Sequence, residues 1–143
     1  MESFSEIFQA MVQDHGQRPR NFGRLEAFTH HAEGVNPLTG DRIEVYFQVS
    51  EADVINAARF SGKLSSLAAT SASVMIPQLI GLARQEAQKL IVETLKRISG
   101  EQPVPEELPE SEYTVLLEIR NFPHRVRCAS LAWNTAATAL ASD

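Results

Sequence analysis

The amino-acid sequence predicts an α+β fold in which a small three-stranded antiparallel sheet carries helices packed on one face. One observation behind this prediction is the stretch 43–49, where apolar side chains alternate with polar or amphipathic ones as in a half-buried strand. The other is the order of the elements, with one helix first, then strands, then further helices. With 143 residues, of which 43% are hydrophobic, the chain is long enough for one ordinary core. We therefore expect a single domain spanning residues 1–143.

The first element is expected to be a helix that begins at a capping box. Ser3 and Glu6 have the spacing at which two side chains satisfy the free N–H groups of a helix start. Apolar residues between positions 4 and 12 recur at helical spacing, and Gly16 and Pro19 end the helix. The basic turn that follows, residues 18–23, is interpreted as solvated surface.

The remaining elements follow from periodicity and from Gly and Pro positions. Besides the strand at 43–49, strands are expected at 54–60 and near 32–36. Helices are expected at 65–82, 83–98 and 128–140, with Glu93 and Arg97 paired on the outer face of the second and Gly100 ending it. The acidic, Pro-rich stretch 101–112 is expected to be an exposed loop, and residues 113–122 fit either a strand or a short helical turn.

Composition and charge exclude several classes of protein. The net charge of −5 argues against sequence-independent binding of nucleic acid, which needs a basic face. A single cysteine, Cys128, rules out an intramolecular disulfide. The acidic N-terminus does not resemble a signal peptide, and Pro77 and several polar residues interrupt the longest apolar region. We therefore expect a cytoplasmic protein that does not bind a membrane.

The stretch "NPLTGD", residues 36–41, is typical of a turn that holds a ligand at the mouth of a strand. Asn36 and Pro37 start the turn, and Gly40 relaxes the backbone before the Asp41 carboxylate. The middle of the turn, however, is Leu38-Thr39, and neither side chain is a strong metal ligand. The turn therefore has the form of a ligand site without an evident ligand set.

Four separated motifs resemble the U-type iron–sulfur cluster assembly scaffolds, the family of the NifU N-terminal domain, IscU and SufU. The family patterns, in chain order, are "DHYxNPRNxG", "GxNPxCGDxIxVxxxV", "FxGxGCAISxASASMM" and "FPxRVKCAxLAW". The corresponding stretches here are "DHGQRPRNFG", "GVNPLTGDRIEVYFQV", "FSGKLSSLAATSASVM" and "FPHRVRCASLAW". The Pro-rich loop and the arginine directly before Cys128 are most similar to the SufU branch, because IscU proteins usually have a histidine there.

This resemblance implies the IscU/SufU-like fold and a site at one tip of the domain, where three cysteines and one aspartate hold zinc or a nascent iron–sulfur cluster. The aspartate corresponds to Asp41 and the third cysteine to Cys128. The first two cysteines fall on Thr39 and Ser65, so two of the three thiolate ligands are missing. The glycine before the second cysteine falls on Leu64.

Three residues bear on the chemistry at this site: His124, His15 and Cys128 itself. His124, four residues before Cys128, is a possible auxiliary ligand, although an exposed loop position is the simpler interpretation. His15 matches a family position that is not a ligand. Cys128 is either a small buried residue or a reactive sulfur acceptor, because a helix start and nearby Arg125 and Arg127 would lower the pKa of its thiol. Ser65 is best interpreted as a helix cap.

The sequence thus predicts a non-enzymatic scaffold homologue with a degenerate site and no bound cofactor. Its expected partners are a cysteine desulfurase or other iron–sulfur assembly proteins, and a homo-oligomer is possible. One alternative is a true metal or cluster carrier whose ligands are completed by His124, a partner or a second copy. The other is a binding module unrelated to cluster assembly.

Overall fold

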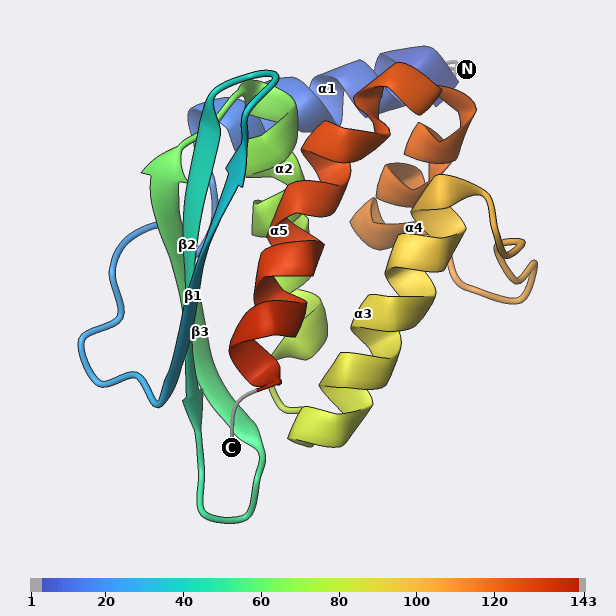
Figure 1. Ribbon diagram of the computed structural model, residues 1–143. Helices are drawn as coiled ribbons and strands as arrows, with labels where there is room; N and C mark the ends of the chain where they lie inside the picture. Colours follow the sequence, from blue (N-terminus) through green and yellow to red (C-terminus); the bar gives the residue numbers. More distant parts are fainter. Residues whose placement is uncertain (1–3, 142–143) are drawn as a thin grey trace.

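The computed structural model describes residues 4–141, which form a three-stranded sheet with helices on one face (Figure 1). The strands are β1 (His30–Asn36), β2 (Asp41–Val49) and β3 (Ile55–Lys63), all antiparallel in the order β1-β2-β3. The helices are α1 (Phe4–Gln17), α2 (Ser66–Leu79), α3 (Arg84–Ser99), α4 (Glu112–Leu117) and α5 (Val126–Leu140). Two short 3-10 helices, η1 (Glu118–Asn121) and η2 (Pro123–Arg125), join α4 to α5.

The predicted fold class is confirmed, and the observed elements differ from the predicted ones mainly at their ends. The strand predicted at 54–60 runs three residues further, and the final helix begins at Val126 rather than Cys128. The ambiguous stretch 113–122 is helical, because the Ser111 side chain caps a helix start there. The predicted capping residue Ser3 lies outside the described residues.

The sheet buries one face under the helices and leaves the other largely polar. Ile43, Val45 and Phe47 of β2 point into the core, as the alternation predicts. On the outer face, Tyr46 is nevertheless buried, since the rings of Phe28 and His31 pack against it. Burial raises the pKa of the Tyr46 hydroxyl, and its hydrogen bond to Glu44 adds to this effect.

Helix α5 crosses the sheet closely and is tied to α2, which fixes where it begins. A Cβ atom at Gly34 would lie only 2.0 Å from the Thr135 hydroxyl oxygen, so glycine permits the close contact of β1 and α5. The fully buried Trp133 donates its indole N–H to Ser71 Oγ at 3.0 Å, and Ser71 donates to the Ala129 carbonyl. Figure 1 shows the β1–β2 turn and the starts of α2 and α5 at the same end of the molecule.

Helix α3 carries the predicted pair Glu93–Arg97, but the pair is not on an open face. The Arg97 guanidinium lies 3.4 Å from Glu93 and also donates to the Tyr113 hydroxyl at 3.1 Å. Only 11% of the Arg97 side chain is exposed, because α4 packs beside it. Gly100 ends the helix in the left-handed conformation, as predicted. Among the described residues, no helix has both the length and the hydropathy that crossing a bilayer requires.

Candidate functional site

The turn between β1 and β2 is built around Asn36. The side-chain oxygen of the buried Asn36 accepts the Leu38 N–H at 3.1 Å, and the Asn36 backbone carbonyl accepts the Gly40 N–H at 2.8 Å. Gly40 has φ of 80°, a conformation that glycine adopts without strain. The Leu38 side chain is 73% exposed at the tip. Hydrogen bonds within the chain therefore hold this turn.

The Asp41 carboxylate, only 4% exposed, joins this turn to the start of α2. Its Oδ1 accepts the Ser65 N–H at 2.6 Å. Its Oδ2 accepts the Thr39 hydroxyl at 2.7 Å and the Ser65 hydroxyl at 3.3 Å. Because three donors converge on it, this carboxylate is hydrogen-bonded within the protein rather than left as an unpaired charge.

Ser65 also caps α2, as the sequence predicts. Its hydroxyl oxygen accepts the Ala68 N–H at 3.4 Å, and its backbone is extended as at other helix N-caps. One serine therefore satisfies the helix start and donates twice to Asp41. Thr39 and Asp41 thus meet Ser65, which lies 24 residues beyond Asp41 in the chain, at one point.

Cys128 lies in the first turn of α5, on a cleft of about 660 Å³ that Ser65 also lines. The other walls include Phe8, Val12 and Arg125. Burial raises the pKa of the Cys128 thiol, and the Asp41 carboxylate raises it further. The prediction that the helix start and the two arginines lower this pKa is wrong: desolvation of the half-buried thiol and the nearby negative charge raise it.

The residues at this point do not fit zinc or an iron–sulfur cluster. Such sites use about four ligands, mostly thiolates or imidazoles. Here Thr39 and Ser65 present neutral hydroxyls, both bonded to Asp41, and the one thiol is stabilised in its protonated form. A cation at this carboxylate would compete with the three hydrogen bonds that it already accepts.

His124, the candidate auxiliary ligand, does not line the cleft beside Cys128. It is exposed on η2, and the cleft beside Cys128 is lined by its neighbour Arg125 instead. The Arg125 guanidinium carbon lies 5.5 Å from the centre of the Phe122 ring.

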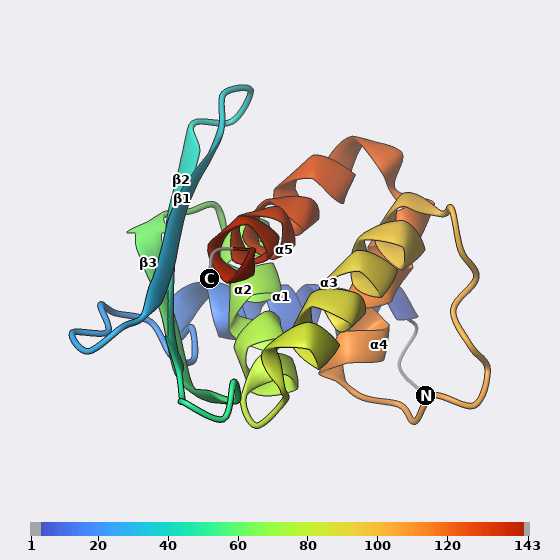
Figure 2. The same ribbon diagram turned by 60° about the horizontal axis from the view of Figure 1, so that its bottom comes forward.

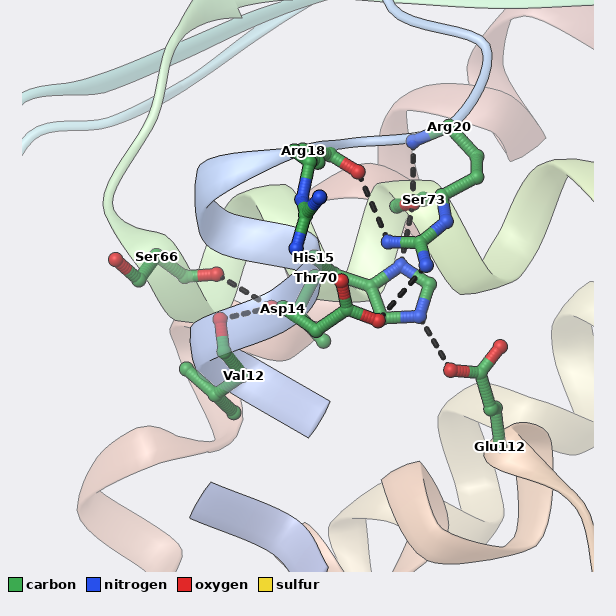
Figure 3. A network of polar contacts seen from close by, with 9 residues as sticks. All are labelled: Val12, Asp14, His15, Arg18, Arg20, Ser66, Thr70, Ser73 and Glu112. Carbon is green, nitrogen blue, oxygen red and sulfur yellow. Dashed lines mark hydrogen bonds and ion pairs between the residues drawn. The ribbon is translucent and has the colours of Figure 1, made fainter. Parts of the chain in front are cut away.

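A second polar cluster, which sequence reasoning missed, surrounds His15 (Figure 3). The His15 side chain is buried, with Nδ1 2.6 Å from Ser73 Oγ and Nε2 2.5 Å from Glu112 Oε2. Arg20 donates its backbone N–H to Ser73 and its guanidinium to Asp14, at 2.8 and 2.7 Å. The hydrogen bond from Arg20 holds the pKa of the Asp14 carboxyl below its usual range.

The cluster ties α1, α2 and α4 together. Asp14, His15 and Glu112 offer three ligand atoms within 4.8 Å of one another, the spread of a loose metal site. However, Arg20 already neutralises Asp14, and its positive charge would repel a cation. The sequence signal for this cluster was a histidine followed by a basic turn. Glu112 lies too far from His15 along the chain for the sequence alone to indicate that the two side chains meet.

Comparison with known proteins decides the family. The family model of the NifU-like N-terminal domain matches residues 7–142 of this sequence. The chain belongs to this family. IscU scaffold proteins for iron–sulfur cluster assembly are 31% identical in Streptococcus pyogenes and 32% identical in Thermotoga maritima. The matches cover 98% and 96% of this chain, and 86% and 94% of those proteins.

Two proteins named SufU are also similar to this chain. The zinc-dependent sulfurtransferase SufU of Bacillus subtilis is 25% identical over 96% of this chain and 91% of its own length. Among solved structures, FiSufU of Fervidobacterium islandicum AW-1, a candidate scaffold for the SUF system, superimposes with a TM-score of 0.80 at 28% identity. The aligned parts are 91% of this chain and 93% of FiSufU. The family recognised from the four motifs is thus confirmed.

Proposed function

We propose that this protein is a scaffold homologue of iron–sulfur cluster assembly that binds assembly partners and does not build a cluster itself. The family and the names of its relatives support the pathway. The observation that carries the loss of cluster building is the bonding of Asp41. In place of two thiolates, Thr39 and Ser65 present hydroxyls, and both donate to this carboxylate.

The change from cysteine to serine or threonine alters the chemistry more than the shape. A thiolate is anionic and soft, and it binds zinc and iron strongly, whereas a neutral hydroxyl is a weak ligand for either. The hydroxyl is instead a good hydrogen-bond donor, so it satisfies the same Asp41 that would otherwise contact a metal. The site positions are therefore retained as a polar link between the β1–β2 turn and α2.

Cys128 is proposed to retain the capacity to accept sulfur from the persulfide of a cysteine desulfurase. In this step the Cys128 thiolate attacks the outer sulfur, a new S–S bond forms, and the desulfurase cysteine leaves as a thiolate. Because burial and Asp41 favour the neutral thiol, transfer at neutral pH is slow and accelerates as the pH rises. The protein is proposed to act as one unit of residues 1–143, in the cytoplasm, without catalytic activity of its own.

Metal and sulfide analysis of anaerobically purified protein tests whether the protein lacks a metal or cluster site. We expect less than a tenth of an equivalent of zinc, iron or sulfide per chain, on the order of background. The Bacillus subtilis SufU, zinc-dependent by name, is the positive control in the same preparation. A stoichiometric metal in the wild-type protein that disappears in Asp41→Ala would overturn the proposal.

A pull-down with the cysteine desulfurase of the host tests the partner. We expect the wild-type protein and the variant Cys128→Ser to retain the desulfurase equally, because docking does not need the thiol. If this protein does not retain the desulfurase while an intact scaffold in the same buffer retains it, the proposed role in cluster assembly is wrong. Sulfur transfer is read separately, as an added mass of one sulfur atom on Cys128.

A further inference from the structure

A groove on the helical side of the molecule lies between α1, α4 and the loop 101–111. Its volume is about 650 Å³, and it is separate from the cleft beside Cys128. Figure 2 shows the loop as an arc at the edge of the helical layer, between the end of α3 and the start of α4. The apolar walls are supplied by Ile7, Met11, Val104, Pro105, Leu108 and Val115.

The apolar walls are accessible to a partner. Ile7 is 41% exposed although it lies on the same helix as the buried Met11. Val104, Leu108 and Val115 are half-buried, packing against the core with part of each side chain. Three prolines stiffen the loop that carries Val104 and Leu108, which reduces the entropy lost when a ligand binds.

The rim of this groove is acidic. Glu110, Glu112 and Glu118 line it, and Glu106 and Glu107 stand on the same loop. The segment 101–112 holds no Lys or Arg. Within residues 4–141, the carboxylates of Glu106, Glu107 and Glu110 form no ion pair with a basic side chain.

We propose that this groove binds a cationic amphipathic segment of a protein partner, with apolar side chains on the groove walls and Lys or Arg against the glutamates. Charge complementarity selects this occupant, since a surface of this sign repels nucleic acid and anionic lipid and attracts a basic segment. Apolar walls with a charged rim are the arrangement by which helix-binding grooves recognise one face of a peptide. The proposal is independent of the Asp41 site and goes beyond the loss of cluster building.

The probe is a fluorescein-labelled helical peptide with leucines on one face and lysines on the other. Two comparison peptides replace Lys by Glu, or Leu by Gly. We expect saturable binding of the Leu/Lys peptide by fluorescence anisotropy, and binding of both comparison peptides weaker by roughly tenfold or more, since each removes one of the two contributions.

Two variants of the full chain locate the binding. Ile7→Ser removes an apolar wall and Glu110→Lys reverses a rim charge; both side chains are exposed, so folding should be unaffected. Each should weaken binding by about three- to tenfold. The matched controls are Val92→Ser, an equally exposed apolar residue on α3, and Glu51→Lys, an exposed glutamate in the β2–β3 turn.

Amide chemical-shift mapping gives a second, position-resolved result. We expect peptide-induced shifts on α1, α4 and residues 104–112, and none on the outer face of the sheet. Equal binding of the Leu/Lys and Gly/Lys peptides, unchanged affinity in both groove variants, or shifts centred elsewhere would each overturn the proposal. None of these outcomes depends on the desulfurase or on metal, so they leave the test of cluster assembly unaffected.

Discussion

The hydrogen bonds of Asp41 lead to a prediction that distinguishes a structural carboxylate from a metal ligand that lacks its metal. In Asp41→Ala, the Ser65 N–H loses its 2.6 Å partner, and the Thr39 and Ser65 hydroxyls lose theirs. A hydrogen bond to a charged group contributes about 1.5–3 kcal/mol. The two hydroxyls belong to exposed residues and can turn to water, so most of the loss comes from the Ser65 N–H. We expect the free energy of unfolding to fall by about 2–3 kcal/mol.

Urea unfolding followed by circular dichroism, without added metal, measures this change. For a chain of this size the loss corresponds to a fall in Tm of roughly 10 °C. Asp41→Asn keeps an acceptor for the Ser65 N–H and should lose only about 1 kcal/mol. Glu33→Ala removes an exposed ion pair with Arg42 and should cost under about 0.5 kcal/mol.

The opposite result has a clear meaning. A buried carboxylate that awaits a cation is an uncompensated charge, and its removal stabilises the metal-free protein. If Asp41→Ala were as stable as wild type or more stable, the hydrogen bonds from Thr39 and Ser65 would not compensate the charge. The interpretation of the site as a self-satisfied polar link would then fail.

Four further predictions concern the same elements. The triple variant Thr39→Cys, Ser65→Cys and Leu64→Gly should bind one zinc per chain by inductively coupled plasma analysis, since it restores three thiolates beside Asp41; a folded variant without zinc would contradict the residue mapping. A strong chelator should leave the Tm of the wild-type protein unchanged, and a fall of many degrees would reveal a metal that supports the fold. Alkylation of Cys128 by iodoacetamide should reach half its maximal rate at a higher pH than alkylation of a cysteine in a peptide. Asp41→Asn should lower that pH because it removes the negative charge. If Cys128 reached half its maximal rate at a lower pH than the peptide cysteine, the direction of its pKa shift would be refuted. His15→Ala should reduce the free energy of unfolding by roughly 2–3 kcal/mol, and Glu112→Gln by under about 1 kcal/mol because it keeps an acceptor, with equal losses arguing against the bond as drawn.

The fold was predictable because local patterns and the resemblance agree. The alternation in 43–49 and the stop at Gly100 each follow from physics that acts over a few residues. The burial of Arg97 was not predictable, since it depends on Tyr113 arriving from another helix. The helical form of 113–117 likewise depends on a cap at Ser111 that a strand-like composition conceals.

The candidate site shows the same division. The correspondence of Thr39, Asp41, Ser65 and Cys128 to family ligand positions comes from the motifs alone and stays a prediction. The direction of the Cys128 pKa shift does not come from the motifs, because it is set by how far the sulfur is desolvated and by which charge lies nearest, and both depend on three-dimensional packing. Arg125 and Arg127, which precede Cys128 in sequence, are both exposed, whereas the negative charge of Asp41 at the start of β2 acts on the thiol.

Serine at position 65 supports the proposal that this site persists without metal. A cysteine there is a poor helix cap, whereas serine is among the best, and Ser65 both caps α2 and donates to Asp41. The free N–H groups at the start of α2 carry a partial positive charge, and the Asp41 carboxylate carries a full negative charge. The two attract each other across the contact between the β1–β2 turn and α2. In this protein the Ser65 hydroxyl and backbone N–H link the start of α2 directly to Asp41. Rebuilding the zinc site must therefore sacrifice this cap, so the triple variant should be less stable than wild type without zinc and should recover on adding it.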